Sequence, residues 1–196
     1  MIAHLRGTLL AKHPNQAIVE AGGVGYDVNI SVPTFSSLPD VGSEVALFIH
    51  MHVREDALSL YGFLQTADKG LFEKLISVSG IGPKLANTIL SGMPETSQIV
   101  NAIRSGDLTR LTRIPGVGKK TAERMVLELR DKFPPSGVEP SPRAATTPVR
   151  EDVISALINL GYKQGEVEKT LAGMPAAGKS ESFDLLFRDV MGWLSK

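Results

Sequence analysis

The sequence Ser79-Gly-Ile-Gly-Pro-Lys84 recurs 36 residues later as Pro115-Gly-Val-Gly-Lys-Lys120. The similarity extends to both sides, because apolar residues at helical spacing align between residues 75–90 and 111–126. Each copy therefore indicates a helix, a glycine–apolar–glycine turn and a second helix that begins beside a lysine. This tandem repeat predicts a helical domain that contains two similar hairpins.

The repeated turn is suited to holding an anion. Glycine has no Cβ, so it allows tight turns and the close approach of another molecule. The first amides of the following helix have no intrahelical acceptor and lie at the positive end of the helix dipole. We therefore predict that each turn grips DNA phosphates without reading sequence, through Gly80, Gly82, Lys84, Gly116, Gly118, Lys119 and Lys120.

One such turn alone is most often a plain connection between helices. Two copies in register, each with lysine, favour the phosphate grip and resemble the helix-hairpin-helix motif of structure-directed DNA-binding proteins. Arg124, on the helix after the second turn, has two open readings: a phosphate contact, or an ion pair with Glu123 or Glu128.

The charge distribution supports this interpretation. The chain has 21 basic and 21 acidic residues, so its net charge is zero. Residues 64–133, however, carry 11 basic and 7 acidic side chains, whereas residues 1–63 carry 3 and 6. A basic segment between acidic ends is a local electrostatic footprint for nucleic acid.

The first 63 residues have the period-two pattern of β-strands. Apolar residues alternate over 24–30 and again over 45–53, and Gly22-Gly23 marks a hairpin turn. About five short strands in this length suggest a small closed barrel.

The remainder divides at a linker. Residues 134–148 are rich in Pro, Ser, Thr and Ala and lack large apolar side chains, so we expect a flexible segment. Three helical patterns follow, and Gly161 ends the first of them. The predicted domains are a barrel (1–63), a tandem-hairpin domain with the start of the linker (64–142), the flexible linker (143–149) and a C-terminal three-helix bundle (150–196).

Several longer stretches resemble the RuvA family, whose members bind Holliday junctions in the bacterial RuvAB branch-migration complex. They include residues 1–7 and 18–26, His52-Val-Arg-Glu-Asp-Ala-Leu-Ser-Leu-Tyr-Gly-Phe63, and both hairpins. The resemblance is detailed over 1–133 and looser over 150–196. It implies an oligonucleotide-binding-type barrel and a homotetramer, which could pair into an octamer, that holds a four-way junction open and flat. It also implies that the chain is not itself an enzyme and needs no cofactor or metal.

The resemblance also implies specific sites. Glu55 and Asp56 match the family's acidic pin, which would place eight carboxylates of a tetramer at the junction crossover. The C-terminal domain would recruit RuvB, the hexameric ATPase, through a surface that includes Leu157, Leu160 and Tyr162. The RuvC resolvase could join this complex.

Two other patterns support no site of their own. Residues 173–180 fit the nucleotide-binding pattern G-x-x-x-x-G-K-[ST], but a polar helical segment precedes them instead of a buried strand. We therefore expect a loop there, with ATP hydrolysis left to the partner. His50 and His52 lie on one face of a strand without further ligands nearby, which favours ordinary strand residues over a metal site.

Two other functional classes would require different residues in this sequence. A helix-hairpin-helix glycosylase or nuclease would need a catalytic Asp or a carboxylate cluster, and Lys119-Lys-Thr-Ala-Glu-Arg124 offers neither. A single-strand binder would need exposed aromatic residues on the barrel, whose candidates are Tyr26, Phe35, Phe48, Tyr61 and Phe63. The absence of Cys, of a signal-peptide pattern and of a long apolar span predicts a cytoplasmic protein that does not bind membranes.

Overall fold

The protein is described from a computed structural model that covers residues 1–133, 148–174 and 182–194. The chain forms two compact units, Met1–Ser136 and Gly137–Lys196. Most of the predicted linker and of the nucleotide-binding pattern lies outside the described residues. The predicted domain boundaries therefore stay a proposal.

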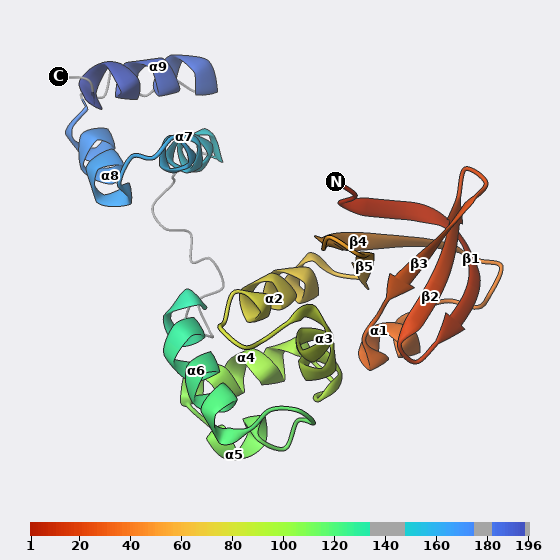
Figure 1. Cartoon of the computed structure of the whole chain (residues 1–196). Helices are drawn as coiled ribbons and strands as arrows, with labels where there is room; N and C mark the ends of the chain where they lie inside the picture. The colour runs from red at the N-terminus through yellow and green to blue at the C-terminus, as the bar shows by residue number, and fades with distance from the viewer. Residues whose placement is uncertain (134–147, 175–181, 195–196) are drawn as a thin grey trace. The chain divides into compact units, whose positions relative to one another are not determined.

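The first unit begins with a closed five-stranded barrel, as the sequence predicts (Figure 1). Its neighbours run in the order β1-β2-β3-β5-β4, and all pair antiparallel except β3 and β5. The alternating apolar residues point inward, and Leu9, Val19, Val28 and Leu47 are fully buried. The strands are β1 His4–His13, β2 Gln16–Ala21, β3 Val24–Asn29, β4 Glu44–Val53 and β5 Leu58–Phe63.

The predicted hairpin turn between β2 and β3 is confirmed. Gly22 and Gly23 have φ angles of +61° and +82°, which glycine adopts without steric cost. Positive φ at both central residues is typical of the type I′ turn that matches the twist of paired strands.

A short helix, α1 (Val32–Ser37), interrupts the β region and was not predicted. The alternating apolar pattern runs over residues 24–30, and β3 ends at Asn29. The helix begins here because the Ser31 hydroxyl accepts a hydrogen bond from the Thr34 amide, and Pro33 suits the first helical turn.

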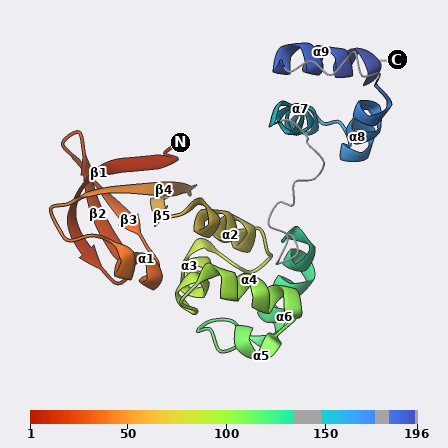
Figure 2. The ribbon, with the colours of Figure 1, turned by 180° about the vertical axis from the view of Figure 1, so that it is seen from behind.

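The rest of the first unit is helical, as predicted. Its core is continuous with the end of the barrel, because the ring of Phe72 lies 5.0 Å from Tyr61 and 5.1 Å from Phe63 between centroids. In both views α2 therefore lies beside β4 and β5 (Figure 2). The elements are α2 Thr66–Ile76, α3 Pro83–Ser91, α4 Thr96–Ser105, α5 Leu108–Leu111, α6 Lys119–Leu129 and the 3₁₀ helix η1 Arg130–Lys132.

The second unit contains three helices, α7 (Pro148–Asn159), α8 (Gln164–Gly173) and α9 (Phe183–Leu194). They pack around an apolar core made of Val153, Leu157, Val167, Leu171, Leu186 and Val190. The helical α8 agrees with the expectation that no buried strand precedes residue 173. Across the described residues, no helix is both long and apolar enough to cross a lipid bilayer.

Candidate nucleic-acid interface

The two glycine turns have nearly the same backbone conformation. The first glycines, Gly80 and Gly116, have φ angles of +90° and +82°. The second glycines, Gly82 and Gly118, have φ and ψ of −86° and 170° in one copy and −84° and 171° in the other. The sequence repeat is therefore a structural repeat.

The apolar residue between each pair of glycines anchors the turn to the core. Ile81 and Val117 are each 4% exposed. Their amides donate to the carbonyls of Val78 and Ile114, both at 3.0 Å. Each turn is thus held from inside the domain, while its glycines face solvent.

The amides at the start of each following helix are available to an outside acceptor. The first helical bonds run from Ala86 N to the Gly82 carbonyl and from Ala122 N to the Gly118 carbonyl, both 2.9 Å long. The amides before Ala86 and Ala122 therefore precede the first intrahelical bond. The second turn has one more such donor, because Lys119 stands where the first copy has Pro83, which has no N–H.

The space around these amides is open and positively charged. No atom lies within 4 Å of the position that a Cβ would take at Gly82 or Gly118. Lys84, Lys119 and Lys120 are all exposed. Backbone donors, helix dipoles and lysines together suit the phosphates of a nucleic-acid backbone.

Arg124 has a partner that neither reading of the sequence foresaw. Its Nη1 donates to the carbonyl of Ser79, in the other turn, at 3.2 Å. No ion pair found among the described residues joins it to Glu123 or Glu128. Arg124 therefore connects the second helix of one hairpin to the turn of the other.

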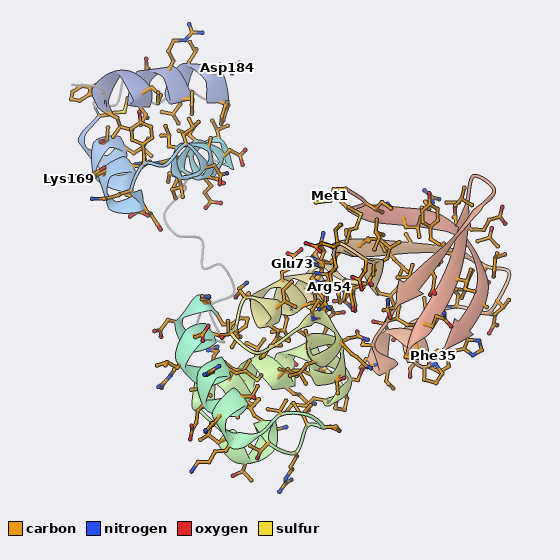
Figure 3. The ribbon with its side chains drawn as sticks, viewed as in Figure 1. Met1, Phe35, Arg54, Glu73, Lys169 and Asp184 are labelled. Atoms are coloured by element: carbon orange, nitrogen blue, oxygen red, sulfur yellow. The ribbon has the colours of Figure 1, made fainter. Side chains whose placement is uncertain are left out.

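The acidic residues Glu55 and Asp56 form the exposed tip of the β4–β5 hairpin. The Arg54 amide donates to the Ala57 carbonyl at 2.8 Å and closes the turn. The Arg54 side chain, labelled with Glu73 in Figure 3, donates from Nε to His52 Nε2 at 3.2 Å. The guanidinium therefore points back along the strand and leaves the tip to the two carboxylates.

The Arg54 charge also acts on a tyrosine of the barrel. Burial raises the pKa of the Tyr61 hydroxyl, and the positive charge of Arg54 partly opposes this shift. The sequence motif Arg-Glu-Asp does not indicate that its positive and negative charges point in different directions, because this depends on the conformation of the arginine side chain.

Each part of this architecture matches a family model of known proteins. Residues 1–62 match the family model described as "RuvA N terminal domain", and residues 148–183 match "RuvA, C-terminal domain". Residues 72–131 match "SAM-like Helix-hairpin-helix tandem". A protein of Solibacter usitatus named "Holliday junction branch migration complex subunit RuvA" is 57% identical over 191 residues, 96% of this chain and 96% of its own length.

The chain belongs to the RuvA family. A relative of the same name from Geobacter metallireducens is 48% identical over 201 residues and covers 100% of both chains. The barrel, the tandem hairpins and the C-terminal domain of this chain are thus the parts of a RuvA protein, in the order that the sequence predicts.

The aromatic residues of this RuvA-type barrel are mostly engaged with other protein groups. Tyr61 and Phe63 are buried against Phe72. Phe35 lies under the Lys12 ammonium, and Phe48 forms a T-shaped ring pair with His4. This arrangement leaves little aromatic surface for stacked bases and disfavours the single-strand hypothesis.

The two barrel histidines have separate surroundings. His50 lies 5.2 Å from Phe72 between ring centroids, and its Nδ1 is 3.3 Å from Glu73 Oε1. His52 accepts from Arg54. The contacts of His50 thus join the barrel to α2, and the contact of His52 holds the arginine beside the tip.

The three C-terminal residues predicted as partner contacts differ in exposure. Leu157 is fully buried in the core of the domain, so it supports the domain from inside. Leu160 is 61% exposed, and Tyr162 is partly buried against the core. Of the three, only Leu160 offers a large exposed apolar surface.

This segment also ends α7. Gly161 has a φ of +98°, its amide donates to the Ile158 carbonyl at 2.9 Å, and Tyr162 donates to the Leu157 carbonyl at 3.1 Å. The two bonds form a Schellman cap, which confirms that Gly161 ends the helix. Leu157 and Tyr162 therefore have a structural role that their sequence pattern could not separate from partner binding.

Proposed function

We propose that this chain binds four-way DNA junctions as the non-enzymatic subunit of a branch-migration complex in recombination and repair. The observation that carries this proposal is the pair of matching glycine turns, each with open helix amides beside exposed lysines. The name of these relatives, "Holliday junction branch migration complex subunit RuvA", supports the same function.

The proposed contacts bind the backbone without reading sequence. Gly80, Gly82 and Lys84 form the first grip, and Gly116, Gly118, Lys119 and Lys120 form the second. Two grips of similar shape, which share one apolar core, fit phosphates at two places on a DNA duplex.

The proposed assembly is a homotetramer with Glu55 and Asp56 at its centre, where they hold strands apart at the crossover. Its support in the structure is the surface beside the acidic tip. Val53 and Leu58, the last pair of the β4–β5 ladder, are 60% and 59% exposed. A pair of apolar side chains at the base of a charged tip suits burial against a neighbouring subunit.

The proposed role of the C-terminal domain is to recruit the RuvB ATPase, which performs the ATP hydrolysis, while RuvC can join the complex. Exposed apolar side chains on the domain support this role. They include Leu160 at 61%, Leu185 at 54% and Trp193 at 53% exposed. Such surface residues suit a partner that covers them.

Binding measurements with three DNA substrates test the function. We expect affinity to fall from a four-way junction to a duplex to a single strand of the same sequences. Preferred binding of the single strand would contradict the proposal, and so would cleavage or base removal by the protein alone. Native mass spectrometry with and without the junction distinguishes four subunits from eight, and a monomer on the junction would contradict the tetramer.

A further inference from the structure

Two contacts cross between the hairpins in opposite directions. From the helix of the second hairpin, Arg124 Nη1 reaches the Ser79 carbonyl in the first turn at 3.2 Å. From the helix of the first hairpin, Leu85 Cδ1 lies 3.0 Å from the position of a Cβ at Gly116 in the second turn. Each glycine turn is thus in contact with the helix that follows the other glycine turn.

The Arg124 guanidinium also lies within van der Waals range of the first glycine turn. A Cβ at Gly80 would lie 3.7 Å from Arg124 Nη1, so the guanidinium lies directly against this glycine turn. The contact is exposed at its outer side, because Ser79, Gly80 and Arg124 all face solvent. It therefore lies beside the surface that presents the first grip.

We propose that Arg124 is a positioning residue that fixes the spacing of the two phosphate grips through the Ser79 carbonyl. Binding by two linked grips depends on how well the second is placed once the first has bound. A contact that holds both in the bound geometry raises affinity without touching the ligand. The planar guanidinium suits this task because it loses little conformational freedom per hydrogen bond. This inference rests on the proposed DNA-binding function.

The alternative role of Arg124 is a direct phosphate contact, and salt dependence separates the two. The slope of log affinity against log salt is negative, and removing a side chain that binds phosphate reduces its magnitude by about 0.9. We expect Arg124→Ala to weaken junction binding roughly tenfold, as weaker linkage between grips allows, with an unchanged slope. Lys120→Ala is the matched control, since it removes a charge from the same helix but should lower the slope.

A double-mutant cycle tests the linkage itself. If Arg124 couples the grips, Lys84→Ala should cost less in the Arg124→Ala background than in the parent, because the first grip is already misplaced. Arg124→Lys, which keeps the charge and much of the reach, should restore part of the affinity. Additive costs together with a reduced slope for Arg124→Ala would overturn the proposal and make Arg124 a phosphate ligand.

Hydrogen exchange without DNA keeps the two proposals separable. We expect the Ile81 amide to exchange faster in Arg124→Ala than in the parent, with no change in Lys120→Ala. Unchanged exchange at Ile81 would overturn the positioning role. If the parent failed to bind DNA but exchange at Ile81 still responded, the proposed function would fail while the contact between hairpins would stand.

Discussion

The side-chain amide of Asn87 donates to the carbonyl of Ile30 at 2.9 Å, and this bond joins α3 to the end of β3. One turn further along α3, the Ser91 hydroxyl accepts from the Val32 amide at 3.0 Å. Residues four apart share a face of a helix, so this face of α3 rests on the barrel. The helix that begins at the first glycine turn is therefore anchored to the barrel.

We expect Asn87→Ala to destabilise the first unit by about 1–3 kcal/mol, because the Ile30 carbonyl would lose its side-chain donor in a partly buried site. Circular dichroism during chemical denaturation measures this change. Thr88→Ala is the control, since the Thr88 hydroxyl donates to the Lys84 carbonyl of its own helix and, within the described part of the chain, to no residue of the barrel. Equal effects of the two substitutions would show that the bond to Ile30 does not stabilise the fold.

Changing Lys84, Lys119 and Lys120 together to Ala should weaken binding to any junction, whatever its sequence. The salt slope should fall by about 0.9 for each phosphate that the variant no longer binds. The pair Lys119 and Lys120 should account for more of this fall than Lys84 alone. Lys163→Ala with Lys169→Ala, in the second unit, is the control, and a slope equal to the parent's in the triple variant would show that these lysines do not touch phosphate.

Substitutions at Gly116 and Gly118 should separate fold from binding. Gly116→Ala should cost about 1–2 kcal/mol of stability, since a left-handed backbone disfavours a Cβ and Leu85 lies 3.0 Å away. At Gly118 the space for a Cβ is open and the backbone is extended, with a φ of −84°. Gly118→Ala should therefore cost less than about 1 kcal/mol of stability.

The Gly118 variant should nevertheless bind junctions more weakly, because its new methyl group occupies the space in front of the helix amides. We expect affinity to fall roughly tenfold, which corresponds to 1.4 kcal/mol. Thermal melting and junction titration measure the two effects. A Gly118→Ala protein with parental affinity would mean that no phosphate approaches this turn.

Replacing Glu55 by Gln and Asp56 by Asn preserves size and removes two negative charges from each tip. Carboxylate–phosphate repulsion several ångströms apart is worth about 1 kcal/mol in water and more where water is scarce. We expect tighter binding to both junction and duplex, with the larger gain on duplex, so that selectivity for junctions falls. If the variant forms tetramers but binds duplex no better than the parent, the tip is a solvated turn.

A chain that ends at Pro134 should still form tetramers and bind junctions, but it should not stimulate the RuvB ATPase. The reason is that, among the described residues, the apolar cores of the first unit are built from residues before 134. In the full chain, Leu160→Asp should weaken stimulation, because it places a charge on an exposed apolar site. Lys179→Ala is the control and should leave ATP turnover of the complex intact. Failure of the truncated chain to form tetramers would contradict the proposed division.

Local features were predictable from the sequence because nearby residues determine them. The repeat predicts the paired turns, Gly22-Gly23 predicts the β2–β3 hairpin, and Gly161 predicts the end of α7. The helix α1 has only six residues, too few to show a helical period. Its available signals were Ser31 and Pro33, a cap and a first-turn proline.

Contacts between distant segments were not predictable. The bonds from Arg124 to Ser79 and from Asn87 to Ile30 join residues 45 and 57 positions apart. These bonds depend on how the helices pack, and helix packing cannot be inferred from the pattern of a single sequence. Leu157 illustrates a related limit, because a buried core residue and a partner contact share the same apolar stripe on a helix.

The parallel pairing of β3 with β5 has a consequence for how the chain matures at the ribosome. Val28 pairs with Leu60, so the barrel stays an open sheet with two bare edges until the fifth strand has been synthesised. That strand runs almost directly into α2, whose Phe72 packs on Tyr61 and Phe63. The same short stretch of nascent chain therefore closes the barrel and positions α2 against it. An arrest of synthesis before Leu58 would release a product whose sheet has exposed edge strands.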